Sequence, residues 1–172
     1  MNLQSDDFEL FGMPRRFEQD AAQLDARWKE LQRQAHPDRF AVQGAAAQRV
    51  AMQWSVRINE AYRRLQEPLA RAAYLCELGG APVQAEDNTA MPAAFLMQQM
   101  EWREALDDAA SEQDVETLRA SVRAAEQETF ARCAHAIDQT QDFSAAAREV
   151  RALMFLARFA LSVEQRAEQL GQ

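Results

Sequence analysis

The chain has 172 residues, a net charge of −8, and only five glycines and five prolines. Its composition, rich in Ala, Gln, Glu, Arg and Leu, predicts an all-α protein with one large core or two small ones. No apolar run approaches the roughly 18 residues of a membrane span, and no secretory leader is visible. We therefore expect a cytoplasmic protein that does not bind a membrane.

The negative charge belongs to the second half of the chain. Residues 1–80 carry 11 acidic and 11 basic side chains, whereas residues 81–172 carry 16 acidic and 8 basic ones. An acidic surface repels phosphate backbones, which argues against nucleic-acid binding. The two cysteines, Cys76 and Cys133, belong to no closely spaced pair. They predict no zinc site and are interpreted as buried free thiols.

The first expected elements are a short helix and a longer one. An apolar run at residues 8–11 predicts one or two helical turns, which end at Gly12 and Pro14. Asp20 has the side chain of an N-cap. The helix that follows it carries one apolar stripe, formed by Leu24, Trp28, Leu31 and Ala35.

A polar corner, His36-Pro37-Asp38, follows this helix. Pro37 lacks an N–H group and disfavours helical geometry in the residue before it, so the helix should end at His36 and Asp38 should project from the bend. Lys29 and Arg33 form a basic strip that leads into the corner. Taken alone, the strip fits a solvated helix face as well as a binding surface, and the tripeptide fits an ordinary helix stop.

Two further helices complete the first domain. The helix from Gly44 to Gln66 should pack antiparallel on the preceding one. A shorter helix should begin at Pro68 and close at Gly79-Gly80. The expected inner stripe of the long helix is Met52, Ser55, Ile58, Ala61, Tyr62 and Leu65.

The rest of the chain predicts a linker and a helical bundle. Residues 81–90 have no apolar periodicity. We therefore expect a first domain at 1–79, a linker at 80–91 and a second domain at 92–172. Helices are predicted at about 92–110, 113–138 and 143–168, with start signals at Asp114 and Asp142, and they should form an antiparallel three-helix bundle.

The first helix of the bundle has two apolar faces. A rotation of about 100° per residue places a core stripe on one side, formed by Phe95, Trp102, Ala105, Leu106 and Ala109. Leu96, Met97 and Met100 lie opposite, among carboxylates. In the last helix Phe155 points away from the core stripe that contains Val150 and Leu153. Such a surface fits a partner-binding site, and packing on the first domain or self-association fits it equally well.

The sequence resembles a known family along nearly its whole length. The matching blocks are Leu10-Phe11-Gly12, Leu31-Gln32-Arg33-Gln34, His36-Pro37-Asp38-Arg39-Phe40, Ile58-Asn59-Glu60-Ala61-Tyr62, Pro68-Leu69-Ala70-Arg71-Ala72, Phe95-Leu96-Met97, Val150-Arg151 and Phe155-Leu156. The first blocks are typical of any J domain. The later ones resemble the HscB family, the J-domain co-chaperones of iron–sulfur cluster assembly.

This resemblance implies two partners and no catalysis by the chain itself. An N-terminal J domain would stimulate the ATPase of a DnaK-like chaperone, HscA in bacteria, and a C-terminal three-helix bundle would deliver the scaffold protein IscU to it. The chaperone-binding residues would be His36, Pro37, Asp38, Lys29, Arg33 and Arg39. The scaffold-binding residues would be Leu96, Met97, Met100, Glu101, Glu104, Asp108 and Phe155. No metal or cofactor is expected.

Two other functions are compatible with parts of the sequence. A general J protein that serves a housekeeping DnaK chaperone would carry the same corner but bind other clients. His36 and Asp38 could also form the acid–base pair of a small hydrolase. That reaction needs a concave pocket with supporting groups, which a tight surface corner does not provide.

Overall fold

The computed structural model describes residues 2–83 and 91–171, and these residues form helices and no strand, which confirms the all-α prediction. They divide into two compact units, Met1–Leu75 and Cys76–Gln172. The boundary falls within α4 (Pro68–Leu78). Most of the expected linker, residues 84–90, lies outside the described residues, so the predicted domain limits stay a prediction. Within the described residues, each helix is too short or too polar to cross a lipid bilayer.

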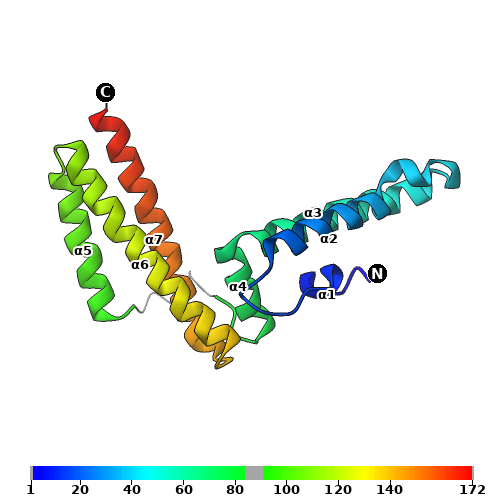
Figure 1. Ribbon diagram of the computed structural model, residues 1–172, viewed down its shortest axis with the longest axis horizontal. Coiled ribbons are helices and arrows are strands. Elements are labelled where there is room, and N and C mark those ends of the chain that lie inside the picture. Colours follow the sequence, from blue (N-terminus) through cyan, green and yellow to red (C-terminus); the bar gives the residue numbers. More distant parts are fainter. Residues whose placement is uncertain (1, 84–90, 172) are drawn as a thin grey trace. The chain divides into compact units, whose positions relative to one another are not determined.

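The first unit is built on an antiparallel hairpin of α2 (Ala21–Ala35) and α3 (Ala45–Gln66), joined by the 3-10 helix η1 (Pro37–Gln43) (Figure 1). The Trp28 ring stacks on Tyr62 with ring centroids 4.7 Å apart. The Trp28 indole N–H also donates to the Asn59 side chain at 3.0 Å. These contacts fix the register of the two helices close to the middle of the hairpin.

A short helix, α1 (Asp7–Phe11), closes the core of the first unit. Phe8 and Phe11 are almost fully buried. The Asp7 carboxylate is also buried and forms ion pairs with Arg57 at 2.7 Å and Arg64 at 3.3 Å, both from α3. The helix is therefore attached to the hairpin by an apolar contact and by charge.

The predicted burial of one residue of the inner stripe of α3 is wrong. Met52 is 59% exposed, whereas its neighbour Ala51 is buried together with Ile58, Ala61 and Leu65. The two neighbours lie at the edge of the stripe, where a rotation of about 100° per residue does not decide which one faces α2.

The second unit is a three-helix arrangement of α5 (Ala93–Asp108), α6 (Glu112–Asp138) and α7 (Phe143–Leu170). Helices α6 and α7 supply most of the buried side chains, whereas no residue of α5 itself is fully buried. Trp102 and Leu106 of α5 pack partly buried on a small core that contains Ala109, Val115, Leu118 and Val163. Ala105 was expected in the core stripe but is exposed. The face of α5 that packs on the other helices is therefore narrower than predicted.

Capping side chains explain where the helices begin. Asp20 accepts a hydrogen bond from the Gln23 N–H, and Asp142 accepts one from the Ala145 N–H, which confirms both as N-caps. The cap of α6 is Ser111 rather than Asp114. Asp114 instead completes a capping box by accepting hydrogen bonds from the backbone of Ala110 and Ser111, which lowers the pKa of its carboxyl group.

Candidate functional site

The His36-Pro37-Asp38 corner is exposed at the point where the hairpin turns. Helix α2 ends at Ala35, and His36 takes an extended conformation with ψ 127°, so the predicted helix end is confirmed. The His36 side chain is 58% exposed and the Asp38 side chain 90% exposed. The Asp38 N–H donates to the His36 Nδ1 at 3.3 Å, which holds the imidazole over the start of η1.

Two side chains hold the backbone of the corner in place. The Ser55 hydroxyl of α3 donates to the Ala35 carbonyl at 3.3 Å. The Arg39 guanidinium donates to the Arg33 carbonyl at 3.2 Å, and so caps the C-terminus of α2 with a positive charge. Arg39 therefore stabilises the corner as well as contributing to the charge around it.

Of the two basic residues before the corner, Arg33 forms an ion pair and Lys29 does not, among the described residues. Arg33 donates to both oxygens of Glu30, at 3.0 and 2.7 Å. These hydrogen bonds lower the pKa of the Glu30 carboxyl and raise that of the Arg33 guanidinium. Lys29 is exposed and has no such partner among the described residues. Of the two residues of the predicted strip, only Lys29 is therefore an unpaired cation among the described residues.

The exposure of the corner argues against hydrolase chemistry. An acid–base pair works in a concave site that excludes water and positions the substrate. His36 and Asp38 instead project into solvent, with the nearest oxygen of Asp38 3.7 Å from the His36 Nδ1. Among the described residues, no group of three or more His, Cys, Asp or Glu side chains is placed to hold a metal ion.

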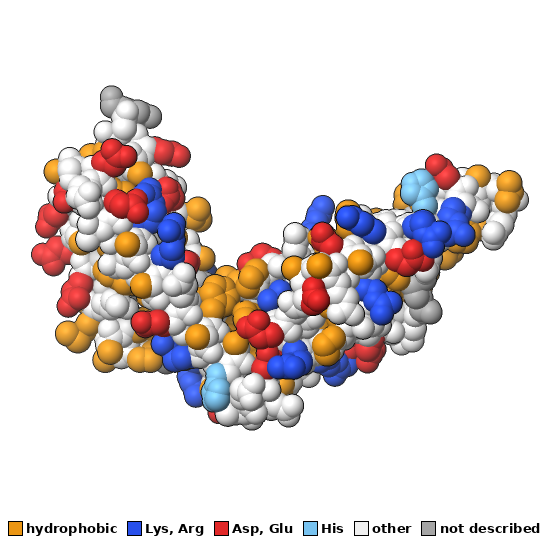
Figure 2. Space-filling model, viewed as in Figure 1, with side chains coloured by type: hydrophobic (Ala, Val, Ile, Leu, Met, Phe, Trp, Pro, Cys, Tyr) orange, Lys and Arg blue, Asp and Glu red, His pale blue; other side chains and the backbone are white. Residues whose placement is uncertain are grey.

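The second candidate surface is the outer face of α5. Leu96, Met97 and Met100 are 44%, 62% and 70% exposed. Glu101, Glu104 and Asp108 are exposed on the following turns. Figure 2 shows apolar and acidic side chains gathered over this helix. The helix therefore presents an apolar surface bordered by carboxylates, as expected from its periodicity.

Phe155 departs from its predicted position on a solvent face. It is only partly exposed and meets Phe95 of α5 edge to face, with ring centroids 6.2 Å apart. Its ring lines a groove of about 300 Å³ between α5 and α7. The difference arises because α5 leans on this side of α7, which the periodicity of α7 alone cannot reveal. Phe155 therefore contacts Phe95 of the predicted core stripe and not the outer face of α5.

The sequence reasoning missed two features of these surfaces. The pairing of Glu30 with Arg33 follows from a three-residue spacing that could have been recognised. The cations Arg103 and Arg158 line the groove beside Phe155, and Arg158 lies 5.8 Å from the centre of the Phe155 ring. They come from two helices, so no local pattern places them together.

Comparison with known proteins finds relatives along the whole chain. A family model described as the HSCB C-terminal oligomerisation domain matches residues 91–164. The "Co-chaperone protein HscB homolog" of Burkholderia multivorans is 47% identical over 173 residues, which cover 99% of this chain and 98% of that protein. The protein of the same name from Cupriavidus taiwanensis is 52% identical over 158 residues, with 91% and 90% covered.

Solved structures give the same result. The chaperone HscB from Vibrio cholerae has a TM-score of 0.80 and 34% sequence identity, and the match covers 96% of this chain and 99% of that one. The human co-chaperone protein HscB has a TM-score of 0.88 and 28% identity, with 96% and 83% covered.

Proposed function

Because the chain belongs to the HscB family of co-chaperones, we propose that it stimulates the ATPase of an HscA-type, DnaK-like chaperone and delivers an IscU-type scaffold protein to it in the cytoplasm. Its role in iron–sulfur cluster assembly is that of an adaptor between two proteins. The cluster would be carried by the scaffold and not by this chain.

The exposed corner is the observation that supports this proposal most strongly. A protein that accelerates a partner's ATPase must bind one conformation of that partner better than another. Pro37 provides rigidity, and the 90% exposed Asp38 side chain offers a carboxylate suited to an arginine of the chaperone. The basic Lys29, Arg33 and Arg39 would orient the first unit on an acidic chaperone surface.

The outer face of α5 supports the delivery half of the proposal. Exposed apolar side chains with an acidic border fit a partner that offers an apolar patch surrounded by basic residues. We assign scaffold binding to Leu96, Met97 and Met100, with Phe155 at the neighbouring groove. Glu101, Glu104 and Asp108 would contribute mainly at low salt, because exposed charges are screened.

The chaperone half is tested by measuring ATP hydrolysis by the HscA-type chaperone with and without the chain. His36→Gln and Asp38→Asn should abolish the stimulation while helicity and melting temperature stay nearly unchanged, because both side chains are exposed. Glu18→Gln, an exposed change elsewhere in the first unit, is the matched control. Normal stimulation by either corner variant would remove the role assigned to the corner.

The scaffold half is tested by calorimetric titration with the IscU-type protein. Truncation of an interface anchor costs about 1–3 kcal/mol of binding free energy, so Leu96→Ala, Met97→Ala and Met100→Ala should each weaken binding roughly 5- to 150-fold. Unchanged affinity in all three variants would contradict the assignment.

A general J protein of a housekeeping DnaK chaperone is the alternative. The two are separated by offering both chaperones to the chain in the presence of the scaffold protein. We expect the stimulation of the HscA-type chaperone to increase when the scaffold is added. Equal stimulation of both chaperones, with no effect of the scaffold, would favour the alternative.

A further inference from the structure

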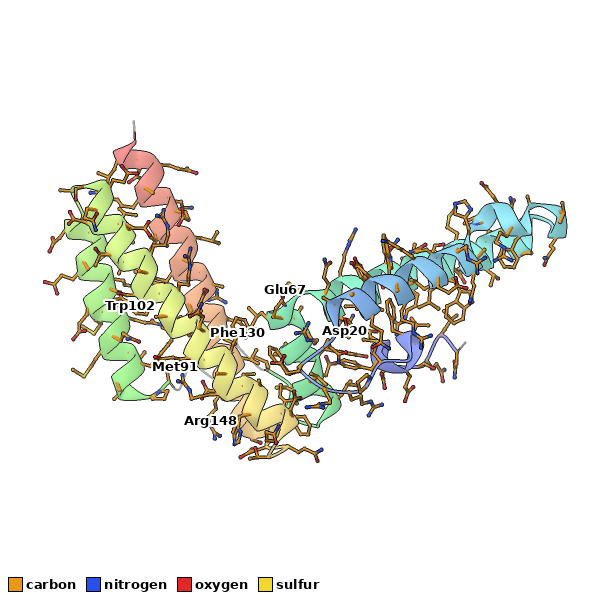
Figure 3. All side chains as sticks on the ribbon, viewed as in Figure 1. Asp20, Glu67, Met91, Trp102, Phe130 and Arg148 are labelled. Atoms are coloured by element: carbon orange, nitrogen blue, oxygen red, sulfur yellow. The ribbon has the colours of Figure 1, made fainter. Side chains whose placement is uncertain are left out.

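A second groove of the C-terminal unit lies outside both proposed surfaces. It is bounded by the start of α5, the middle of α6 and the first half of α7, and has a volume of about 520 Å³. Met91, Phe95 and Leu156 are among its apolar lining residues. Figure 3 labels Met91 and Arg148, which both line it. None of Leu96, Met97 and Met100 is among the lining residues.

The groove contains a largely buried arginine whose Nε has no hydrogen-bond partner among the described residues. Arg151 of α7 is only 9% exposed, and its Nε is buried with no hydrogen-bond partner. Within the described residues, no ion pair joins Arg151 to a carboxylate. An isolated buried charge is costly unless it is neutralised by an opposite charge. Among the described residues, the position of Arg151 is therefore suited to an additional anionic group.

The other charges of the groove strengthen this requirement. Arg132 is already paired with Glu149 at 3.2 Å. Arg148 is exposed and has no partner among the described residues. Three arginines and two glutamates line the groove, so its net charge is +1 in a half of the chain that carries 16 acidic and 8 basic residues. The groove is thus a basic site on an acidic unit.

The apolar walls indicate what kind of anion fits. A groove of about 520 Å³ is far larger than one carboxylate needs, and Phe95 and Leu156 offer it apolar contacts. We propose that this groove binds an acidic peptide segment of a partner protein, with a carboxylate on Arg151 and Arg148 and an adjacent apolar side chain on Phe95 and Leu156. Both cations and both apolar contacts belong to one groove, so a single short segment can reach them together.

The test uses the full chain and a labelled peptide of alternating leucine and glutamate with blocked ends. Fluorescence anisotropy measures its binding, and NMR follows the Nε–H signals of the arginines. We expect peptide binding to shift the Arg151 signal. Arg151→Met should weaken binding about tenfold or more, because it removes one partner of a desolvated charge pair. Arg148→Gln should weaken binding about two- to fivefold, because Arg148 is exposed. Arg123→Gln, on an exposed position outside the groove, should bind normally.

Stability separates a binding role of Arg151 from a structural one. If its charge is unpaired, Arg151→Met should leave the melting temperature of the free chain unchanged or raise it. A fall in melting temperature would make Arg151 a structural residue and overturn the proposal.

Matched probes test the occupant. A peptide with glutamine in place of glutamate should bind about tenfold or more weakly, whereas Leu96→Ala should not affect binding of the acidic peptide. The proposal is overturned if inorganic phosphate shifts the Arg151 signal as strongly as the peptide does, because the site would then serve a small anion. It is also overturned if light scattering shows a dimer that Arg151→Met dissociates.

Discussion

Lys29 and Arg33, the two basic residues before the corner, differ in whether their charge is already paired. Lys29 and Arg33 occupy the same face of α2, four positions apart, and both were predicted to bind the chaperone. In the structure Glu30 neutralises Arg33 through two hydrogen bonds, while Lys29 is left exposed. A cation that is already paired gains less from an acidic partner, because it must first give up its own carboxylate.

This difference leads to a prediction for the basic strip. Lys29→Gln should reduce ATPase stimulation about two- to fivefold at subsaturating chain, the range that an exposed ion pair provides, and Arg33→Gln should reduce it less. Glu30→Gln should increase the stimulation, because it frees Arg33. Salt should weaken the wild type and leave the double variant of Lys29 and Arg33 less affected. Equal losses in both single variants, or stimulation that does not depend on salt, would contradict this order.

A second prediction concerns Asp7, a residue that the sequence did not single out. Its carboxylate is buried between Arg57 and Arg64, and its N–H donates to the Tyr74 hydroxyl at 3.0 Å. Asp7→Ala leaves the mostly buried Arg57 without its carboxylate and should cost about 3–5 kcal/mol of the free energy of unfolding. Urea unfolding followed by circular dichroism measures this loss.

The control for Asp7 is Asp38→Asn in the same unit. Its side chain is 90% exposed, so the unfolding midpoint should not move. If Asp7→Ala unfolded at the same urea concentration as this control, the ion pairs of α1 would contribute nothing to stability.

At the level of elements, capping residues and proline predicted where helices begin and end. The sequence did not predict which side chains are buried where that depends on a neighbouring helix. Asp20, Asp142 and the proline at position 37 act within one turn of their own position, so the ends of α2 and the start of α7 could be read from the sequence. The burial of Ala51 instead of Met52 depends on the path of a second helix.

The candidate surfaces likewise combine features that one helix determines with features that depend on the packing of several helices. The exposure of Leu96, Met97 and Met100 follows from the period of one helix, and the corner follows from one proline. The contact of Phe155 with Phe95 and the burial of Arg151 depend on how α5, α6 and α7 pack together. Non-local packing of this kind leaves no signal in a single sequence.

Helix α5 provides a prediction at this scale. Trp102 stacks on Phe159 with ring centroids 5.7 Å apart, whereas Met100, two residues earlier, is 70% exposed. Trp102→Ala should destabilise the second unit by about 2 kcal/mol, less than the roughly 3–5 kcal/mol of a fully buried tryptophan. Met100→Ala should change stability by less than about 0.5 kcal/mol.

Thermal melts and amide hydrogen exchange of α5 distinguish the two variants. Exchange should accelerate along α5 in Trp102→Ala and stay unchanged in Met100→Ala. If Met100→Ala melted as early as Trp102→Ala, the outer face of α5 would be packed against other residues and could not serve as a free binding surface.

At the scale of the whole molecule, both cysteines are buried free thiols, as the sequence predicted. Cys76 belongs to α4 and Cys133 to α6, and both side chains are fully buried and free. Burial disfavours the charged thiolate and raises the pKa of Cys76 to about 11. Burial, together with nearby Cys76, Glu149 and Asp138, raises the pKa of Cys133 to about 12.

These raised pKa values make stability depend on pH in the alkaline range. Below the ordinary thiol value of 9.0 both states keep their protons, so the thiols have no effect on the pH dependence there. As the pH rises through 9, the unfolded chain loses thiol protons that the folded chain retains, and the free energy of unfolding falls. The fall should continue until the pH reaches the folded values of about 11 and about 12.

Urea unfolding at a series of alkaline pH values measures the slope. The raised pKa of Tyr74 adds a fall of the same sign above its ordinary value of 10.0, so the thiol effect is isolated by the double variant Cys76→Ala and Cys133→Ala. That variant should lose stability more slowly between pH 9 and 10, and a slope identical to that of the wild type would show that the thiols ionise equally in both states.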